Sequence, residues 1–250
     1  MTEPAISRGA RPAGASDERT SAAAVQQMFD SIAPRYDLLN HVLSCNVDRW
    51  WWWRAARQFR RVLVRPEAAV LDICCGTGDM TLALLRHRPD AGRPILAADF
   101  SHAMLARGVE KFRGRNVVAI EADALRLPLA SDSLDLVTSA FGFRNLANYE
   151  AGLMEFHRVL RAGGELGILD FSEPGGAAGK LYAFYFRRVL PAIGSRLSGN
   201  GSAYAYLPSS VHRFPPPPEM LQLMRKAGFT QVSWTPYSFG IAALYRGIKA

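Results

Sequence analysis

The chain has 250 residues, 49% of them hydrophobic and 21% charged, which is the composition of a globular protein of one domain with additions. It contains no run of 18 apolar residues and no apolar signal core near its N-terminus, so neither a transmembrane helix nor secretion is expected. The net charge of +8 leaves nucleic acid, an anionic membrane surface and acidic substrates open as partners. Three cysteines without metal-ligand spacing predict no metal site and fit a reducing cytoplasm, where we expect the protein to work.

The N-terminal part is expected to be a tail followed by helices. Residues 1–20 are mostly Ala, Gly, Pro, Ser and charged residues without periodicity, which predicts a disordered tail. A helical pattern begins at residue 21 and ends at Pro34, and a second short helix is expected over residues 35–43. With the segment that follows, these helices form a predicted N-terminal lid over residues 21–65.

Four consecutive tryptophans lie among arginines in residues 49–65. Helical spacing sorts this segment into two sides. The apolar side is expected to carry Trp51, Trp52, Ala55, Ala56, Phe59, Val62 and Leu63. The other side is expected to carry Trp50, Trp53 and six arginines. The helix either packs its apolar side on the core or lies in the headgroup layer of an anionic membrane, where Trp and Arg are both favoured.

Strands and helices alternate over residues 68–173, which predicts an α/β fold with a mostly parallel sheet and helices on both faces. The expected strands are residues 70–73, 95–99, 117–121, 134–140 and 166–171. The expected helices are residues 80–88, 102–112 and 149–160. Ligands of such sheets bind outside the carboxyl ends of the strands.

The first of these strands ends in the pattern Asp72-x-x-x-Gly76-x-Gly78, a glycine turn that leads into a helix. A dinucleotide fingerprint would need Gly or Ala at the position of Thr81, and a phosphate-binding loop would need a Lys that is absent here. We expect Asp72, Gly76 and Gly78 to lie at a ligand, although the turn alone is also compatible with a generic α/β connection.

The next two strands end in acidic residues as well. Asp99 follows Gly78 by 21 residues, where a carboxylate can accept both ribose hydroxyls of a nucleoside. Asp123 follows the third strand. Three acidic strand ends without an anion-binding loop suit a cationic nucleoside that has no phosphate, and S-adenosylmethionine is such a molecule.

The pattern changes after Glu173. Residues 175–218 hold an aromatic segment and end in four consecutive prolines, and we interpret them as an insertion on the substrate side. The four prolines are expected to form a stiff extended stretch. Residues 219–250 are expected to form a helix over 219–226 and a strand pair over 229–236 and 239–246.

These residues carry a resemblance to a known family. The matching segments are MFDSIAPRYDLLN (28–40), VLDICCGTGD (70–79), AADFSHAML (97–105), EADALRLPL (121–129), FGFRN (141–145), RVLRAGGELGILDFSEP (158–174), LPAIG (190–194), YAYLPSSV (204–211) and AGFTQV (227–232). The chain resembles the class I S-adenosylmethionine-dependent methyltransferases, and within them the UbiE/COQ5 (MenG) quinone C-methyltransferases. The resemblance implies a Rossmann-like seven-stranded sheet with a last antiparallel strand, in a single domain over residues 21–250.

The resemblance also implies a reaction and a set of site residues. The implied reaction is methyl transfer to a ring carbon of a reduced polyprenyl quinone, either a naphthoquinol or a benzoquinol. The implied cofactor contacts are Thr77, Asp99, Asp123 and Ala124, while Ala140 stands where the family often has Ser. We expect Arg144 to hold the quinol oxygen, with a pairing to a structural carboxylate as the alternative.

Two residues of the lid are further candidates. Tyr36 and Asp37 would orient the ring or relay its proton, unless they only cap and pack the short helix. Other readings stay open: a methyltransferase of another small lipid or aromatic metabolite, or a membrane-docking module without catalysis. A nucleic-acid partner is not expected, because the strand before Phe141 lacks the Pro-Pro-aromatic turn of base methylases.

Overall fold

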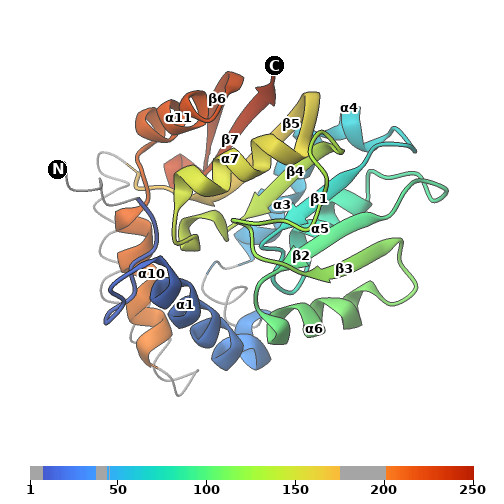
Figure 1. Cartoon of the computed structure of the whole chain (residues 1–250). Helices are drawn as coiled ribbons and strands as arrows, with labels where there is room; N and C mark the ends of the chain where they lie inside the picture. Colours follow the sequence, from blue (N-terminus) through green and yellow to red (C-terminus); the bar gives the residue numbers. More distant parts are fainter. Residues whose placement is uncertain (1–7, 38–43, 45, 175–200) are drawn as a thin grey trace.

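Seven strands form one sheet in the computed structural model, which describes residues 8–37, 44, 46–174 and 201–250 (Figure 1). The strands are β1 (Val70–Ile73), β2 (Ile95–Asp99), β3 (Val117–Glu121), β4 (Leu134–Ala140), β5 (Leu160–Phe171), β6 (Phe229–Tyr237) and β7 (Ala242–Lys249). Their order is β3-β2-β1-β4-β5-β7-β6, and β7 is antiparallel to both of its neighbours. This confirms the predicted α/β class and the antiparallel last strand.

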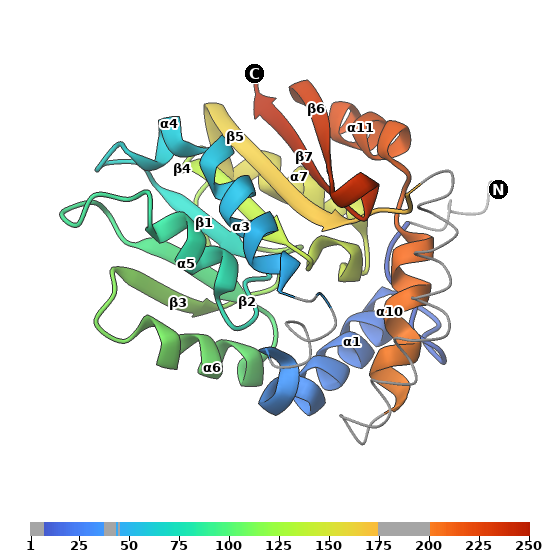
Figure 2. The same cartoon turned by 180° about the vertical axis from the view of Figure 1, so that it is seen from behind.

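Helices cover the sheet from two sides and close its carboxyl edge. The helices are α1 (Glu18–Ile32), η1 (Ala33–Arg35), α3 (Val47–Gln58), α4 (Arg60–Leu63), α5 (Asp79–Leu85), α6 (His102–Phe112), η2 (Phe143–Asn145), α7 (Tyr149–Val159), α10 (Gly201–Arg213), α11 (Pro217–Lys226) and η4 (Ser238–Gly240). Figures 1 and 2 show α7 and α11 on one face and α3 and α5 on the other. The helices α1 and α10 lie side by side at the end of the sheet where the strands β1 to β4 point.

The four predicted strands from residue 70 to residue 140 have the predicted bounds. The fifth begins at Leu160 instead of residue 166, because Leu160 already pairs with Leu134 of β4.

The prolines at 215–218 are not all extended as expected. Pro217 is the first residue of α11, where its fixed φ suits a helix and its missing N–H is not needed.

The two sides predicted for the tryptophan segment are confirmed. The residues of the predicted apolar side, Trp51, Trp52, Ala55, Ala56, Phe59, Val62 and Leu63, are all buried. They pack with Val70 and Leu136 of the sheet in one core cluster. Trp50 and Trp53 remain exposed. The apolar side therefore packs on the core, and any contact with a membrane must come from the outer side.

The N-terminus differs from the expected tail, because Gly9 and Ala10 are buried and α1 begins at Glu18, capped by Asp17. The Ala10 N–H donates to the Leu146 carbonyl at 2.7 Å, and the Tyr149 N–H donates to the Arg8 carbonyl at 2.8 Å. A Cβ on Gly9 would overlap the backbone of the same loop. Composition did not reveal this contact, because it is made by backbone atoms and needs small residues rather than large apolar ones.

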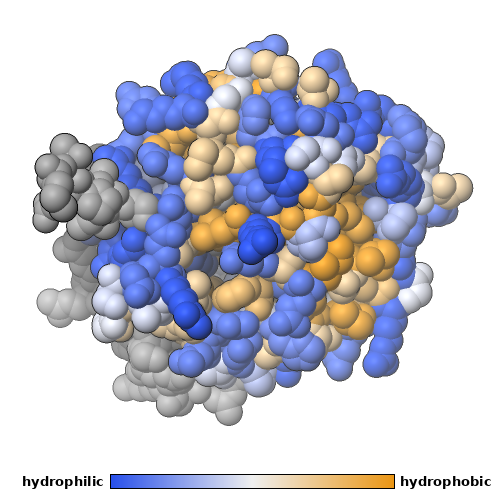
Figure 3. Space-filling model, in the orientation of Figure 1, coloured by the Kyte–Doolittle hydropathy of each residue, from blue (hydrophilic) through white to orange (hydrophobic). Residues whose placement is uncertain are grey.

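Part of one sheet face is covered by no helix of the described residues. The surface over β2 and β3 is visibly apolar in Figure 3, and Val118 of β3 is exposed there, beside the partly buried Leu96 and Ile120. Residues 38–43 of the short helix expected over 35–43, and the aromatic segment 180–190, lie outside the described residues. Within the described part of the chain, every helix is too short or too polar to cross a membrane.

Candidate functional site

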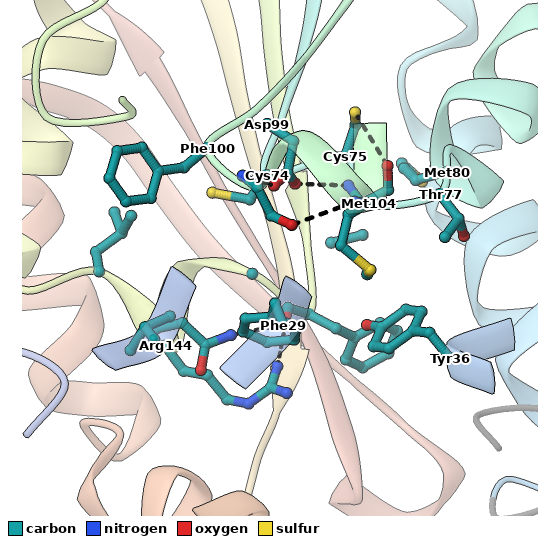
Figure 4. Close-up of a pocket in the computed structure, with 18 of the residues that line it drawn as sticks. Phe29, Tyr36, Cys74, Cys75, Thr77, Met80, Asp99, Phe100, Met104 and Arg144 are labelled. Atoms are coloured by element: carbon teal, nitrogen blue, oxygen red, sulfur yellow. Dashed lines mark hydrogen bonds between the residues drawn. The ribbon is translucent and has the colours of Figure 1, made fainter. Parts of the chain in front are cut away.

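A cavity of about 360 Å³ opens at the carboxyl ends of the parallel strands, within the usual size of ligand pockets. The loops after β1, β2, β3 and β4 form one wall, and residues of α1, α3 and α10 form the other. Figure 4 shows Asp99 and Cys75 on one side of this space, with Phe29 and Arg144 on the opposite side. The strand-end rule therefore located the cavity correctly.

The loop after β1 is held in a left-handed backbone conformation. Cys74, Gly76 and Gly78 have φ values of 56°, 55° and 88°. A side chain on Gly78 would overlap the ring of Phe112, so α6 packs directly on this turn. Gly76 lines the cavity, whereas Gly78 lies behind it and shapes the turn. The bare backbone at Gly76 leaves room for a ligand to lie against the main chain.

Asp99 joins the loops after β1 and β2. One carboxylate oxygen accepts from the Gly76 N–H at 2.7 Å and the other accepts from the Ser101 N–H at 2.8 Å. Burial raises the pKa of Asp99, while these backbone donors favour its charged form. Asp99 and Asp123 line the same cavity, together with the buried Ala124. The structure thus brings Thr77, Asp99, Asp123 and Ala124 to one cavity, as the resemblance implies.

Asp72, like Gly78, is a predicted ligand contact that does not line the cavity. Its carboxylate is fully buried and accepts from the hydroxyls of Thr81 at 2.6 Å and Thr138 at 2.8 Å, behind the cavity wall. This corrects the expectation that Asp72 lies at the ligand, because both of its oxygens are used to tie β1 to α5 and β4. Burial raises the pKa of Asp72 to about 6, against 3.8 for an ordinary Asp.

This raised pKa predicts a pH-dependent stability. As pH rises from about 4 to about 6, the unfolded chain loses the Asp72 proton while the folded chain keeps it, so folding becomes less favourable. The shift from 3.8 to about 6 corresponds to a loss of about 3 kcal/mol. Urea unfolding of wild type and Asp72→Asn should show this loss only in wild type. Two stability curves that stay parallel from pH 4 to pH 7 would contradict it.

The two lid residues differ in position. Tyr36 lines the cavity, with its ring centroid 6.1 Å from that of Phe29. Asp37 instead faces the loop after β1, where it accepts from the Thr77 hydroxyl at 2.5 Å and lies 2.7 Å from the Lys111 ammonium. This corrects the expectation that Asp37 orients the ring, because its carboxylate is already held on the cofactor side.

Arg144 is buried and paired. Its guanidinium lies 2.9 Å from one carboxylate oxygen of Asp170, and the backbone N–H of Arg144 donates to the other oxygen at 3.0 Å. Burial opposes the charge of Arg144, but Asp170 outweighs this effect and the pKa is raised. The structure therefore shows the pairing with a structural carboxylate that the sequence left as the alternative. Arg144 nevertheless lines the cavity, so pairing does not remove its charge from the site.

Sequence reasoning missed three residues that build the site. Asp170 is the second-last residue of β5, the last parallel strand, and the strand-end rule would have found it. Tyr206 of α10 lines the cavity and donates to the Asn145 side chain at 3.2 Å, and burial raises its pKa to about 12. Lys111 bridges Asp37 and Asp79, at 2.7 and 3.0 Å, and nothing in its helical pattern singles it out.

The donor set fits a cationic nucleoside. Among the described residues that line the cavity, the acids are Asp48, Asp79, Asp99 and Asp123 and the only base is Arg144. Burial raises the thiol pKa of Cys74 and Cys75, so neither adds a thiolate. A pyrophosphate would meet carboxylates here, whereas a ribose and a sulfonium would meet acceptors of suitable charge. The residues present therefore fit S-adenosylmethionine.

Comparison with known proteins agrees with this fit. The model of the ubiE/COQ5 methyltransferase family matches residues 15–249. The chain is 45% identical over 237 residues to a demethylmenaquinone methyltransferase of Deinococcus radiodurans, covering 93% of this chain and 95% of that protein. It is 46% identical over 223 residues to a demethylmenaquinone methyltransferase of Thermus thermophilus, covering 88% and 99%.

A solved structure shares the fold. It is a Thermotoga maritima protein described as an S-adenosylmethionine-dependent methyltransferase, possible histamine N-methyltransferase. The TM-score is 0.60 at 19% identity, over 90% of this chain and all of that one. Because the family model matches residues 15–249, this protein is a member of the ubiE/COQ5 methyltransferase family.

Proposed function

We propose that this protein transfers a methyl group from S-adenosylmethionine to a ring carbon of a reduced polyprenyl quinone, with demethylmenaquinol as its substrate. One observation carries the proposal: among the described residues that line the cavity, the buried Arg144 is the only cation and the other charged residues are carboxylates. The names of the Deinococcus and Thermus relatives support a naphthoquinol over a benzoquinol.

The acidic end of the cavity would hold the cofactor. Asp99 lines this end and would accept from ribose hydroxyls, and the bare backbone of Gly76 with Thr77 would border the rest of the molecule. Bound S-adenosylmethionine supplies an electrophilic methyl group on a sulfonium. Carboxylates that line this end favour a positively charged ligand and disfavour a phosphate.

The opposite end would hold the ring. The aromatic residues Phe29, Phe141 and Phe171 line it beside Arg144, and the ring centroids of Phe141 and Phe171 lie 4.7 Å apart. A fixed guanidinium would stabilise the phenolate that forms when the quinol releases its hydroxyl proton to water, which raises electron density at the ring carbon. After this carbon has accepted the methyl group, it would lose its own proton to water and the ring would become aromatic again. No histidine is among the described residues of this cavity, so stabilisation of the anion replaces an imidazole base in this proposal.

The aromatic walls also fit a second candidate, a different aromatic or lipid-like acceptor on the same scaffold. One experiment separates the two. The purified protein is incubated with labelled S-adenosylmethionine and either reduced demethylmenaquinone or a reduced benzoquinone precursor, and the mass of each product is measured. We expect one added methyl group on the naphthoquinol. Labelled product from neither quinol would contradict the proposed substrate class.

A further inference from the structure

Phe239 is unusual for two reasons. Its side chain is 90% exposed, and its φ of 59° lies in the left-handed region, between Ser238 at 47° and Gly240 at 94°. A left-handed conformation is costly for an aromatic residue, and such outliers persist where the surroundings impose them. Packing within the described chain cannot offset this cost for a ring that lies almost wholly in water.

The neighbouring outer side of α3 joins tryptophans to arginines. Trp50 and Trp53 are 41% and 40% exposed. The Arg54 guanidinium lies 5.1 Å from the ring centroid of Trp50, and that of Arg57 lies 4.7 Å from the ring of Trp53. Tryptophan and arginine side chains both favour the layer between lipid tails and water.

Contacts join α3 to residues 237–238, next to Phe239, at the edge of the cavity. The Trp51 indole N–H donates to the Ser238 hydroxyl at 2.9 Å, and the Trp50 ring lies 5.8 Å from Tyr237. Trp51, Ser238 and Ile241 also line the cavity. Figure 2 shows α3 on the side of the sheet that faces the viewer, beside β5. Phe239 therefore lies in the sequence between Ser238 and Ile241, two residues of the cavity wall, and its own ring is exposed.

The charge of this region decides the partner. Residues 47–65 contain six arginines, and their only acid, Asp48, is buried. We infer that Trp50, Trp53, Arg54, Arg57 and Phe239 form a docking surface for an anionic lipid bilayer, which we call the lipid-docking edge. The inference rests on the proposed function in one respect, since a polyprenyl quinol resides in a bilayer and would reach the cavity from this edge.

Vesicle co-sedimentation tests the inference without relying on activity. Wild type should bind vesicles of phosphatidylglycerol and phosphatidylcholine, and should bind phosphatidylcholine alone far more weakly. Phe239→Ser should weaken binding to the vesicles about tenfold, because the variant loses one aromatic side chain that would become buried in the bilayer. Trp234→Ser is the control, because Trp234 is another exposed aromatic residue, at 40%, but lies on β6 outside the proposed surface.

A pair of charge variants provides the second arm. Arg54→Gln with Arg57→Gln should weaken binding to the anionic vesicles about tenfold or more. Arg113→Gln with Arg115→Gln, two exposed residues after α6, removes the same charge elsewhere and should have little effect. Equal losses in both pairs would show that only net charge matters and would overturn the assignment of this edge.

Turnover then separates docking from chemistry. Phe239→Ser should methylate a short-chain, water-soluble quinol at the wild-type rate and lose most activity on a long-chain quinol in vesicles. Wild type that stays off anionic vesicles, or that forms a dimer broken by Phe239→Ser, would overturn the inference. Phe239-dependent vesicle binding without methylation of the soluble quinol would support the lipid-docking edge while contradicting the proposed function.

Discussion

Arg144→Ala is expected to abolish most turnover while leaving the affinity for S-adenosylmethionine within a few fold of wild type. Loss of a fixed group that stabilises a developing anion typically lowers kcat by about 100- to 1,000-fold. Arg144 lies on the wall opposite Asp99, so the cofactor end keeps its own contacts (Figure 4). The measurement is kcat with saturating reduced demethylmenaquinone, alongside calorimetric titration of the cofactor.

The same substitution should also destabilise the fold, because it leaves Asp170 buried without its 2.9 Å partner. Breaking a buried ion pair on one side costs about 3–5 kcal/mol. The double variant Arg144→Gln, Asp170→Asn removes both charges and should recover much of the stability but none of the turnover. Arg158→Ala is the control, since it breaks a pair with Glu155 that is partly exposed. Near-normal turnover by Arg144→Ala would remove this residue from the mechanism.

Asp99→Ala is expected to weaken binding of S-adenosylmethionine at least tenfold. A hydrogen bond to a charged group contributes about 1.5–3 kcal/mol, and the ribose would lose such contacts. The substitution also removes the acceptor of the Gly76 N–H, which lies 2.7 Å away, so the loop after β1 loses a tie to β2. Isothermal titration calorimetry with the purified protein measures the change.

Two further variants sharpen this test. Asp99→Asn keeps an acceptor for one backbone N–H but loses the charge, and should fall between wild type and Asp99→Ala. Asp90→Ala, at an exposed position before β2, should bind the cofactor like wild type. Equal affinities in Asp99→Ala and Asp90→Ala would exclude Asp99 from the cofactor site.

Much of the fold follows from local patterns. The mainly apolar strands β1, β2 and β4 end at Ile73, Asp99 and Ala140 as predicted. Their lengths are set by runs of apolar residues and by the turns that follow. The buried side of α3 was also predictable, since helical spacing alone places Trp51 and Trp52 together. These features depend on neighbours in sequence, and so the sequence was enough.

The site was less predictable where distant residues meet. Asp72 was expected at the ligand, yet the hydroxyls of Thr81 and Thr138 bind it from two other elements. Asp37 was expected at the ring of the substrate, yet Lys111 of α6 holds its carboxylate at the loop after β1. A strand-end carboxylate can point into a cleft or back into the core, and only the packing of neighbouring elements decides which.

The backbone link between residues 8–10 and the loop before α7 bears on where a shortened version of this protein could begin. The Leu146 carbonyl and the Tyr149 N–H are satisfied by Ala10 and Arg8, and Arg144 lies just before this loop. A gene trimmed to start at the first long helix would strip these partners from two backbone groups, one of them on the fully buried Tyr149. Such trimming would destabilise the loop that follows Arg144, although none of the removed residues lines the cavity.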